Sequence, residues 1–546
     1  MQIARLIGGA GTGKTTELLR IMESALEHIK EPTLLGFASF TRAARAEAVG
    51  RASSAWNVAP EVLSKHGWFR TVHSAVLRCL GGDAKDLITE SEKDLHWLSG
   101  VFGVNLSTSV DDELGRTQFI GEPSVASAMN CWSLARTTFQ PLEGVVKRMR
   151  TIDDSVADYA RCVQLIEKYE SAKRVEGKMD FDDMLLMFAG IRCSPTSGTY
   201  ETTPIGEIPG VHAWLFDEQQ DASPLLDAAC RRLVSAPTVK WAYVVGDPFQ
   251  AIYGFAGSSA SCFMSWKADK ERIMPKSYRC PRKILELGEL CLKNTKGYFD
   301  RGIAPADHEG FVYDTGSIDD VVELVDPSQD WLLIARTNYQ AARLAASLHS
   351  FGKPHKWTTQ PEGVTHRSLG LKGLFELEHG RPVTGEQWKH AMELLPQRDK
   401  HGVAFITRGT KSKWKDPEVA KQWDRIWPEE LEQVGATQAL IAKLKSASWV
   451  ELVDKGAKWR ETARRFGVDL ACEPRVRVGT IHSVKGAEAD NVAMLTTTSK
   501  KVDSGMEDQN QRDEECRIAY VGVTRAKKHL HIIREGRPGT PRMEMP

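Results

Sequence analysis

A glycine-rich segment at residues 8–15 has the residue types and spacing that hold the phosphates of a nucleoside triphosphate. It fits the pattern G-x-x-x-x-G-K-[ST], follows an apolar run at residues 3–7 and precedes a helical pattern. In this context, backbone N–H groups and a helix N-terminus surround the phosphates. We expect Lys14 to reach the β- and γ-phosphates and Thr15 to bind Mg²⁺. The predicted phosphate-binding residues are Gly8, Gly11, Gly13, Lys14, Thr15 and Thr16.

Two carboxylates, Asp217 and Glu218, directly follow another apolar run at residues 213–216. A Mg²⁺-dependent hydrolase needs one acid to hold the cation and another to orient and deprotonate the attacking water. We assign the first role to Asp217, acting through water, and the second to Glu218. Acid pairs are also common on protein surfaces. The apolar run before this pair, and the phosphate loop upstream, favour the catalytic interpretation.

Apolar runs alternate with helical patterns along the chain, which predicts parallel sheets covered on both faces. The runs form two sets, so we expect two α/β cores. The first set is residues 3–7, 34–38, 213–216 and 242–245, and the second is residues 331–335, 476–478, 492–495 and 530–533. Two mostly helical stretches interrupt the alternation, and in the second, Thr384 and Gln387 predict a capping box.

Composition excludes several other classes of protein. The 546 residues carry 72 basic and 72 acidic side chains, so a polyanion would have to be held by local grooves. The ten cysteines show no C-x-x-C spacing, which argues against zinc and iron–sulfur sites and favours reduced thiols. There is no membrane-length apolar run, and the first apolar run leaves no room for a signal peptide. We therefore expect a cytoplasmic protein without a membrane partner.

Further segments resemble, in family order, the motifs of UvrD/Rep-type superfamily 1 DNA helicases. Residues 217–221 match D-E-x-Q-D, and residues 246–255 resemble G-D-x-x-Q-x-I-Y-x-F/W. Residues 480–488 resemble T-x-H-x-x-K-G-x-E, and residues 520–528 resemble Y-V-A-x-T-R-A-K. Shorter resemblances lie at residues 40–44, 71–74, 180–185 and 277–280.

The resemblance implies an α/β fold with two RecA-like P-loop NTPase cores, each with a parallel sheet and each interrupted by a mostly helical insertion. ATP and Mg²⁺ are the implied cofactors. We expect core one at 1–75 and 176–272, its insertion at 76–175, core two at 273–358 and 472–546, and its insertion at 359–471.

The resemblance also assigns residues to the nucleotide. Gln250 would sense the γ-phosphate or the attacking water, and Tyr278 would stack on adenine. Arg279 and Arg525, both placed in core two, would reach the γ-phosphate, and Glu488 would meet the sugar. Taken alone, each of the two arginines would more often be a partner in a surface salt bridge. Only seven residues precede Gly8, so the family's upstream adenine-reading glutamine segment is not in the chain, and adenine recognition would depend on Tyr278 and other residues.

On the DNA side, the resemblance makes Phe40, Tyr253 and Phe255 platforms for bases, and it places His73 and His482 against DNA backbone or bases. Without the motifs, aromatic side chains after strands more often belong to the core. The basic segment at residues 411–415, with a tryptophan inside it, could touch duplex phosphates or be a solvated loop.

The sequence therefore predicts an ATP-dependent DNA helicase that moves 3′ to 5′ on single-stranded DNA and separates duplex strands. Its expected partners are single-stranded and tailed duplex DNA, in a bacterial or phage-infected cell. The alternative is a DNA-stimulated ATPase that remodels or clears protein–DNA complexes without strand separation. A scaffold that does not hydrolyse ATP is disfavoured by the complete set of catalytic residues.

Overall fold

The computed structural model divides into two compact units, Met1–Glu309 with Ser504–Thr524, and Gly310–Asp503 with Arg525–Met545. It describes the whole chain except residues 41, 83–84, 86, 90, 112–115, 153–154, 360–365, 399–400, 415, 447–464, 468, 470–472, 507, 537–539, 544 and 546. Residues 273–309 and 504–524, which the sequence-based boundaries assign to core two, belong here to the first unit.

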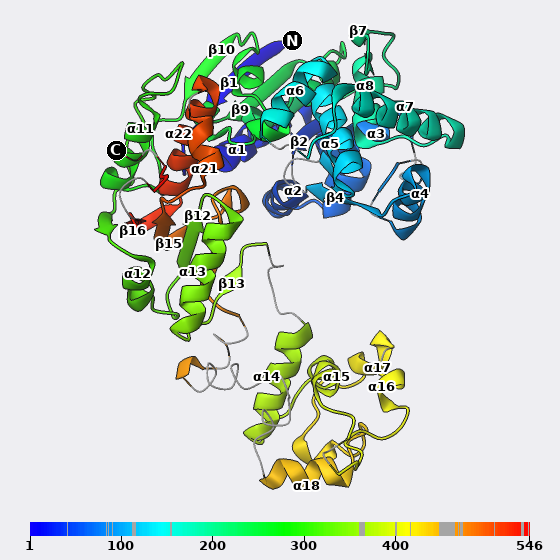
Figure 1. Ribbon diagram of the computed structural model, residues 1–546, viewed down its shortest axis with the longest axis vertical. Coiled ribbons are helices and arrows are strands. Elements are labelled where there is room, and N and C mark those ends of the chain that lie inside the picture. Colours follow the sequence, from blue (N-terminus) through cyan, green and yellow to red (C-terminus); the bar gives the residue numbers. More distant parts are fainter. Residues whose placement is uncertain are drawn as a thin grey trace. The chain divides into compact units, whose positions relative to one another are not determined.

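The first unit contains a six-stranded parallel sheet in the order β10-β1-β9-β8-β2-β3. Figure 1 shows β1, β9 and β10 side by side. Successive residues of β2 pack into different hydrophobic clusters, with Phe37 on one face and Ala38 on the other. Both faces are therefore covered, as expected for parallel strands. The strands are β1 (Gln2–Ile7), β2 (Leu35–Ser39), β3 (Trp68–Thr71), β8 (Ala213–Phe216), β9 (Trp241–Gly246) and β10 (Lys270–Ile273).

Helices cover both faces of this sheet. The cluster around Phe37 takes residues from α1 and α2, and the cluster around Ala38 takes residues from α3, α8, α9 and α10. Helix α11 packs against α22 in the same unit. These helices are α1 (Lys14–Ile29), α2 (Arg42–Trp56), α3 (Val72–Cys79), α8 (Phe181–Ala189), α9 (Pro224–Leu233), α10 (Ala260–Met264), α11 (Arg282–Leu292) and α22 (Gln509–Val523).

Between α3 and α8 the chain forms a mostly helical region with its own hydrophobic core. It also contains the antiparallel pair β4–β5, and a hairpin, β6–β7, follows α8. The elements are α4 (Glu92–Phe102), β4 (Leu106–Asp111), β5 (Arg116–Gly121), α5 (Pro123–Thr138), α6 (Leu142–Ile152), α7 (Tyr159–Glu176), β6 (Ile191–Ser194) and β7 (Gly198–Glu201).

A buried charge cluster joins this helical region to α8. Asp180 caps α8 in a capping box with Asp183, and its carboxylate lies 2.9 Å from the Arg136 guanidinium and 3.0 Å from Lys173 Nζ. Glu170, Asp180 and Asp183 lie close enough together to hold a cation. However, Arg136 and Lys173 already supply the positive charge, so the segment at residues 180–185 is a structural joint.

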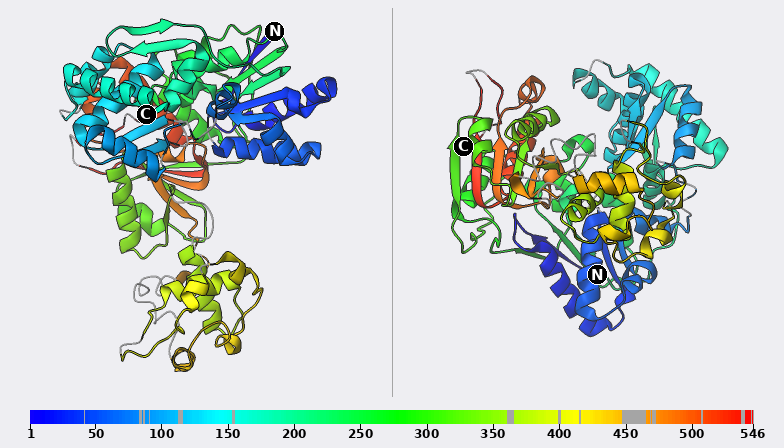
Figure 2. Two further views of the ribbon diagram at one scale, coloured as in Figure 1. Left: turned by 90° about the vertical axis from the view of Figure 1, so that its right-hand side faces the viewer. Right: turned by 90° about the horizontal axis from the view of Figure 1, so that it is seen from below.

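The second unit contains another six-stranded parallel sheet, in the order β11-β16-β15-β12-β14-β13. In the right-hand view of Figure 2, the red and orange strands β16 and β15 lie between green strands from earlier in the chain. Helices α12 (Ile318–Leu324) and α13 (Asn338–Ser350) pack on one face. The strands are β11 (Phe311–Thr315), β12 (Trp331–Ala335), β13 (Lys356–Trp357), β14 (Val476–Thr480), β15 (Ala489–Leu495) and β16 (Ala526–Ile533). Two parallel sheets with helices confirm the predicted α/β fold with two RecA-like cores.

The helices between β13 and β14 pack around a hydrophobic cluster of their own. The predicted capping box is confirmed, since Thr384 Oγ1 accepts the Gln387 N–H at 3.2 Å. Trp414 is buried and Lys411 donates to the Leu395 carbonyl, while Lys415 lies outside the described residues. Burial of Trp414 favours a structural role for this basic segment. The helices are α14 (His366–Glu378), α15 (Gly385–Leu394), α16 (Thr410–Lys413), α17 (Pro417–Lys421) and α18 (Gln438–Ser446), with α21 (Lys500–Gly505) after β15.

Two further observations bear on the class of protein. The nine cysteines in the described residues form no disulfide, and eight of them are buried. Within the described ranges, every helix is too short or too polar to cross a bilayer.

Candidate active site

The glycine-rich loop leaves β1 and enters α1 with the backbone that phosphate binding requires. Gly11 and Gly13 have φ values of 67° and 78°, which favour glycine. A Cβ on Gly8 would lie 2.7 Å from the Lys14 side chain, so the loop closes tightly around that lysine. Gly13, at the N-cap of α1, has no side chain to cap the first N–H groups of the helix. Those donors suit an anion.

Asp217 and Glu218 lie opposite this loop, at the carboxyl end of β8. Thr15 Oγ1 donates to Asp217 Oδ2 at 3.3 Å, and Lys14 Nζ lies 3.8 Å from the Glu218 carboxylate. Burial and the neighbouring Glu218 raise the pKa of Asp217 to about 7. The Thr15 hydroxyl and the buried Asp217 carboxylate are hard oxygen ligands that lie within hydrogen-bond distance of each other, so this pair fits Mg²⁺.

The backbone at Glu218 is strained. Its φ is 54°, a left-handed conformation that is uncommon for residues other than glycine. Glu218 is the N-cap of a short 3₁₀ turn, Gln219–Asp221, and its carboxylate lies near Lys14. Gln220 in that turn donates to the Glu218 carboxylate, and its own Oε1 accepts the Asp247 N–H at 3.0 Å. Gln220 belongs to the motif at residues 217–221, but the sequence alone did not predict this bridging role.

Gln250 follows β9, the strand between β1 and β8 in the sheet. It ends the 3₁₀ turn Pro248–Gln250, and its side chain is buried. The phosphate loop, the acid pair and Gln250 therefore follow three neighbouring strands, β1, β8 and β9, at the carboxyl edge of one sheet. Parallel α/β sheets bind their ligands at this edge.

Tyr278 and Arg279 contact the phosphate loop within the first unit. The Tyr278 N–H donates to the Gly11 carbonyl at 2.8 Å, and Ser277 Oγ donates to the Ala10 carbonyl at 2.7 Å. The Tyr278 side chain is 71% exposed, next to Gly13. An exposed ring beside a phosphate loop suits the expected base stacking. A Cβ on Gly11 would lie 2.3 Å from Arg279 Cβ, so glycine permits this close approach.

Arg525 and Glu488 belong to the second unit. Arg525 is 1% exposed, and its guanidinium donates to the Ala487 carbonyl at 3.1 Å, which excludes the alternative of a surface salt bridge. To reach a phosphate, Arg525 would have to exchange this bond. The Glu488 carboxylate lies 2.7 Å from Lys527 Nζ. His482 is half-buried in the turn after β14.

The five expected DNA contacts differ in exposure. Phe40 and Tyr253 are buried, whereas Phe255 is 63% exposed and packs edge-on against Tyr253 at 6.2 Å. His73 in α3 packs edge-on against Phe181, and burial lowers its pKa to about 4, so its ring is neutral at pH 7. Phe40 and Tyr253 thus fit the core interpretation, and Phe255 is the exposed ring of this motif. Thr41, beside Phe40, lies outside the described residues.

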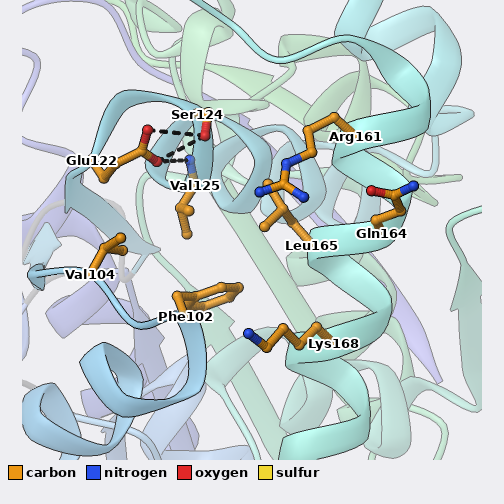
Figure 3. A pocket seen from close by; sticks show the side chains of 9 residues that line it. All are labelled: Phe102, Val104, Glu122, Ser124, Val125, Arg161, Gln164, Leu165 and Lys168. Atoms are coloured by element: carbon orange, nitrogen blue, oxygen red, sulfur yellow. Dashed lines mark hydrogen bonds between the residues drawn. The ribbon is translucent and has the colours of Figure 1, made fainter.

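A cavity of about 380 Å³ lies in the helical region between α4, α5 and α7. Figure 3 shows Arg161 and Lys168 of α7 with Phe102 around it, and Glu122 bonded to Ser124 on the other side. None of the predicted site residues lines this cavity. It is therefore separate from the group of residues at the sheet edge.

The fold and the residues at the sheet edge define a P-loop ATPase with two RecA-like cores. Residues 2–271 match the UvrD/REP helicase N-terminal domain, and residues 463–536 match the UvrD-like helicase C-terminal domain. The chain belongs to the UvrD/Rep-like helicases, which are ATP-hydrolysing DNA helicases.

Three proteins of known name are similar to the chain. A protein named as an ATP-dependent DNA helicase, YjcD of Bacillus subtilis, is 22% identical over 96% of the chain and 76% of its own length. The F-box DNA helicase protein 1 of Schizosaccharomyces pombe is 26% identical over 58% of the chain and 33% of its length. The ATP-dependent DNA helicase UvrD1 of Mycobacterium leprae is 25% identical over 54% of the chain and 38% of its length.

Proposed function

We propose that this protein hydrolyses ATP to move 3′ to 5′ along single-stranded DNA and to separate the strands of a tailed duplex. The observation that carries the proposal is the convergence of Lys14, Glu218 and Gln250 at the ends of three neighbouring strands. The direction of movement rests on the resemblance to the UvrD/Rep branch. Its location would be the cytoplasm.

The site residues divide the chemistry among them. Lys14 and the loop N–H groups would hold the β- and γ-phosphates. Thr15 and Asp217 would hold Mg²⁺, which neutralises phosphate charge. Glu218 would take the proton of the attacking water, and Gln250 would orient that water or contact the γ-phosphate.

The test of this function uses three duplexes that differ only in their single-stranded tail. We expect ATP turnover to rise with single-stranded DNA, and a 3′-tailed duplex to be unwound faster than a 5′-tailed or blunt one. Preferential unwinding of the 5′-tailed duplex would contradict the direction. DNA-stimulated turnover without unwinding of any substrate would favour the alternative, an ATPase that remodels protein–DNA complexes.

Phe255→Ala should lower the affinity for single-stranded DNA, because an exposed aromatic ring can stack on a base. This ring lies only five residues after Gln250. Stacking on one base contributes roughly 1–3 kcal/mol, so the Kd for an oligonucleotide should rise about 5- to 150-fold. Fluorescence anisotropy measures the Kd, and the ATP consumed per base pair separated should rise with it.

Tyr339→Ala is the matched control for Phe255→Ala. Tyr339 is an exposed aromatic residue of α13, and it lies outside the motif segments named above. Its removal should leave DNA affinity and coupling unchanged. Equal Kd values for Phe255→Ala and the unmodified protein would show that the ring at 255 does not bind bases.

A further inference from the structure

A buried polar network lies behind the phosphate loop, in a part of the first unit that the proposed chemistry does not use. Arg301 and Asp247 have side chains with no exposed surface, and their charged groups lie 2.7 Å apart. The buried Tyr520 hydroxyl donates to the other Asp247 oxygen at 3.1 Å, and it accepts the Ala10 N–H at 3.1 Å. This hydroxyl therefore connects the phosphate loop with the residue after β9.

Asp247 extends the connection to the proposed catalytic groups. Its N–H donates to Gln220, which in turn donates to the Glu218 carboxylate. Its Oδ1 accepts the Phe249 N–H at 3.1 Å, at the start of the turn that ends in Gln250. A shift of the phosphate loop would thus reach both turns through a few hydrogen bonds.

Helix α22, which carries Tyr520, also forms hydrogen bonds with residues 251–254, directly before Phe255. The Gly254 N–H donates to Glu514 at 2.9 Å, and Arg517 Nε donates to the Ala251 carbonyl at 2.8 Å. Glu514 and Tyr520 are six residues apart, which is about 9 Å along a helix. One helix therefore contacts the phosphate loop through Tyr520 and the aromatic segment through Glu514 and Arg517.

We propose that Tyr520 is a positioning residue that couples the phosphate loop to the aromatic segment at residues 251–255 through α22. This role rests on the proposed function, because it needs both ATP turnover and DNA binding to be present. The hydroxyl carries the coupling, whereas the ring packs the core. Arg301 lies over the rings of Tyr520 and Phe249, at 5.1 and 4.8 Å from their centres.

The test measures the ratio of ATP turnover with saturating single-stranded DNA to turnover without DNA. Tyr520→Phe keeps the ring under Arg301 and removes the hydroxyl, and we expect the ratio to fall about tenfold. Glu514→Ala, which removes the bond between α22 and the Gly254 N–H, should lower the ratio as well. Because both act through one helix, the double variant should lower the ratio no further than the worse single variant.

Tyr169→Phe is the matched control. Tyr169 is also a buried tyrosine, and its hydroxyl donates to a buried carboxylate, Asp180, at 3.2 Å. Its ratio should equal that of the unmodified protein even if its melting temperature falls. A purely structural hydroxyl at 520 would lower both turnover rates equally and leave the ratio unchanged.

The outcomes separate this inference from the proposed function. If the unmodified protein shows no DNA-stimulated turnover, the proposed function fails. If stimulation is present and Tyr520→Phe retains it in full, the positioning role is wrong. Independent, multiplying losses in Tyr520→Phe and Glu514→Ala would also overturn it. Should Tyr520→Phe not fold, a full ratio in Glu514→Ala alone contradicts the coupling through α22.

Discussion

We expect Glu218→Gln to abolish nearly all ATP turnover and to leave ATP binding intact. General-base catalysis contributes about 10²- to 10⁴-fold, and we expect a loss of that size in kcat at saturating single-stranded DNA. The substitution keeps the shape of the side chain. Its amide oxygen can still accept the bond from Gln220, so the turn at Gln219–Asp221 should persist. Lys14 loses an anionic neighbour at 3.8 Å and remains available to phosphate.

Two measurements check the Glu218→Gln result. Turnover is measured as phosphate release, and ATP affinity as the Kd of a fluorescent ATP analogue. Glu201→Gln, at an exposed position of β7, is the matched control and should change neither value. Full turnover in Glu218→Gln would remove Glu218 from the role of base. A loss of analogue binding would point instead to damage of the phosphate loop.

Residue spacing predicted the strand, glycine loop and helix at residues 2–29 and the strand that ends before Asp217, because these are local features. The loop needs glycines that tolerate positive φ before a helix, and Gly11 and Gly13 adopt such values. The acid pair needs a buried strand directly before it, and β8 is buried along its whole length. The two sheets followed from apolar runs that alternate with helices.

Other features depended on contacts that sequence spacing does not encode. Tyr253 and Phe255 are both aromatic and two residues apart, yet one is buried and the other is 63% exposed. Tyr253 is the N-cap of the 3₁₀ turn Gly254–Ala256, whereas Phe255 lies inside that turn. Arg301 lies in no motif, and its partner Asp247 is 54 residues away. Tyr520 stands in a recognised motif, but its bond to Ala10 spans 510 residues. Such pairs become visible only once the chain has folded.

The unit to which Arg279 belongs also could not be predicted from residue spacing, because it depends on packing. The sequence-based boundaries assign it to core two, where it would act across a cleft. In the structure it belongs to the first unit, and its backbone packs on Gly11 of the phosphate loop. Its guanidinium donates to the Thr524 carbonyl at 3.5 Å, a long distance for such a bond. A phosphate oxygen could replace the Thr524 carbonyl as the acceptor, because so long a hydrogen bond contributes little free energy.

Arg279→Ala should therefore lower kcat by about 10³-fold or more, the range seen when a transition-state arginine is removed. The backbone contacts between residues 277–279 and the phosphate loop do not involve the guanidinium, so the fold should survive. Arg279→Lys should restore little activity, because an ammonium group cannot fork onto two phosphate oxygens. The measurement is kcat at saturating ATP and single-stranded DNA, with the melting temperature recorded alongside.

Arg282→Ala provides the matched control, since Arg282 is an exposed arginine three residues further on, 3.8 Å from Glu286. It should retain full turnover, because exposed ion pairs contribute roughly 0–1 kcal/mol. If Arg279→Lys matched the unmodified protein, the charge alone would suffice and the forked contact would be wrong. If Arg279→Ala also matched it, Arg279 would serve only to pack its backbone against Gly11.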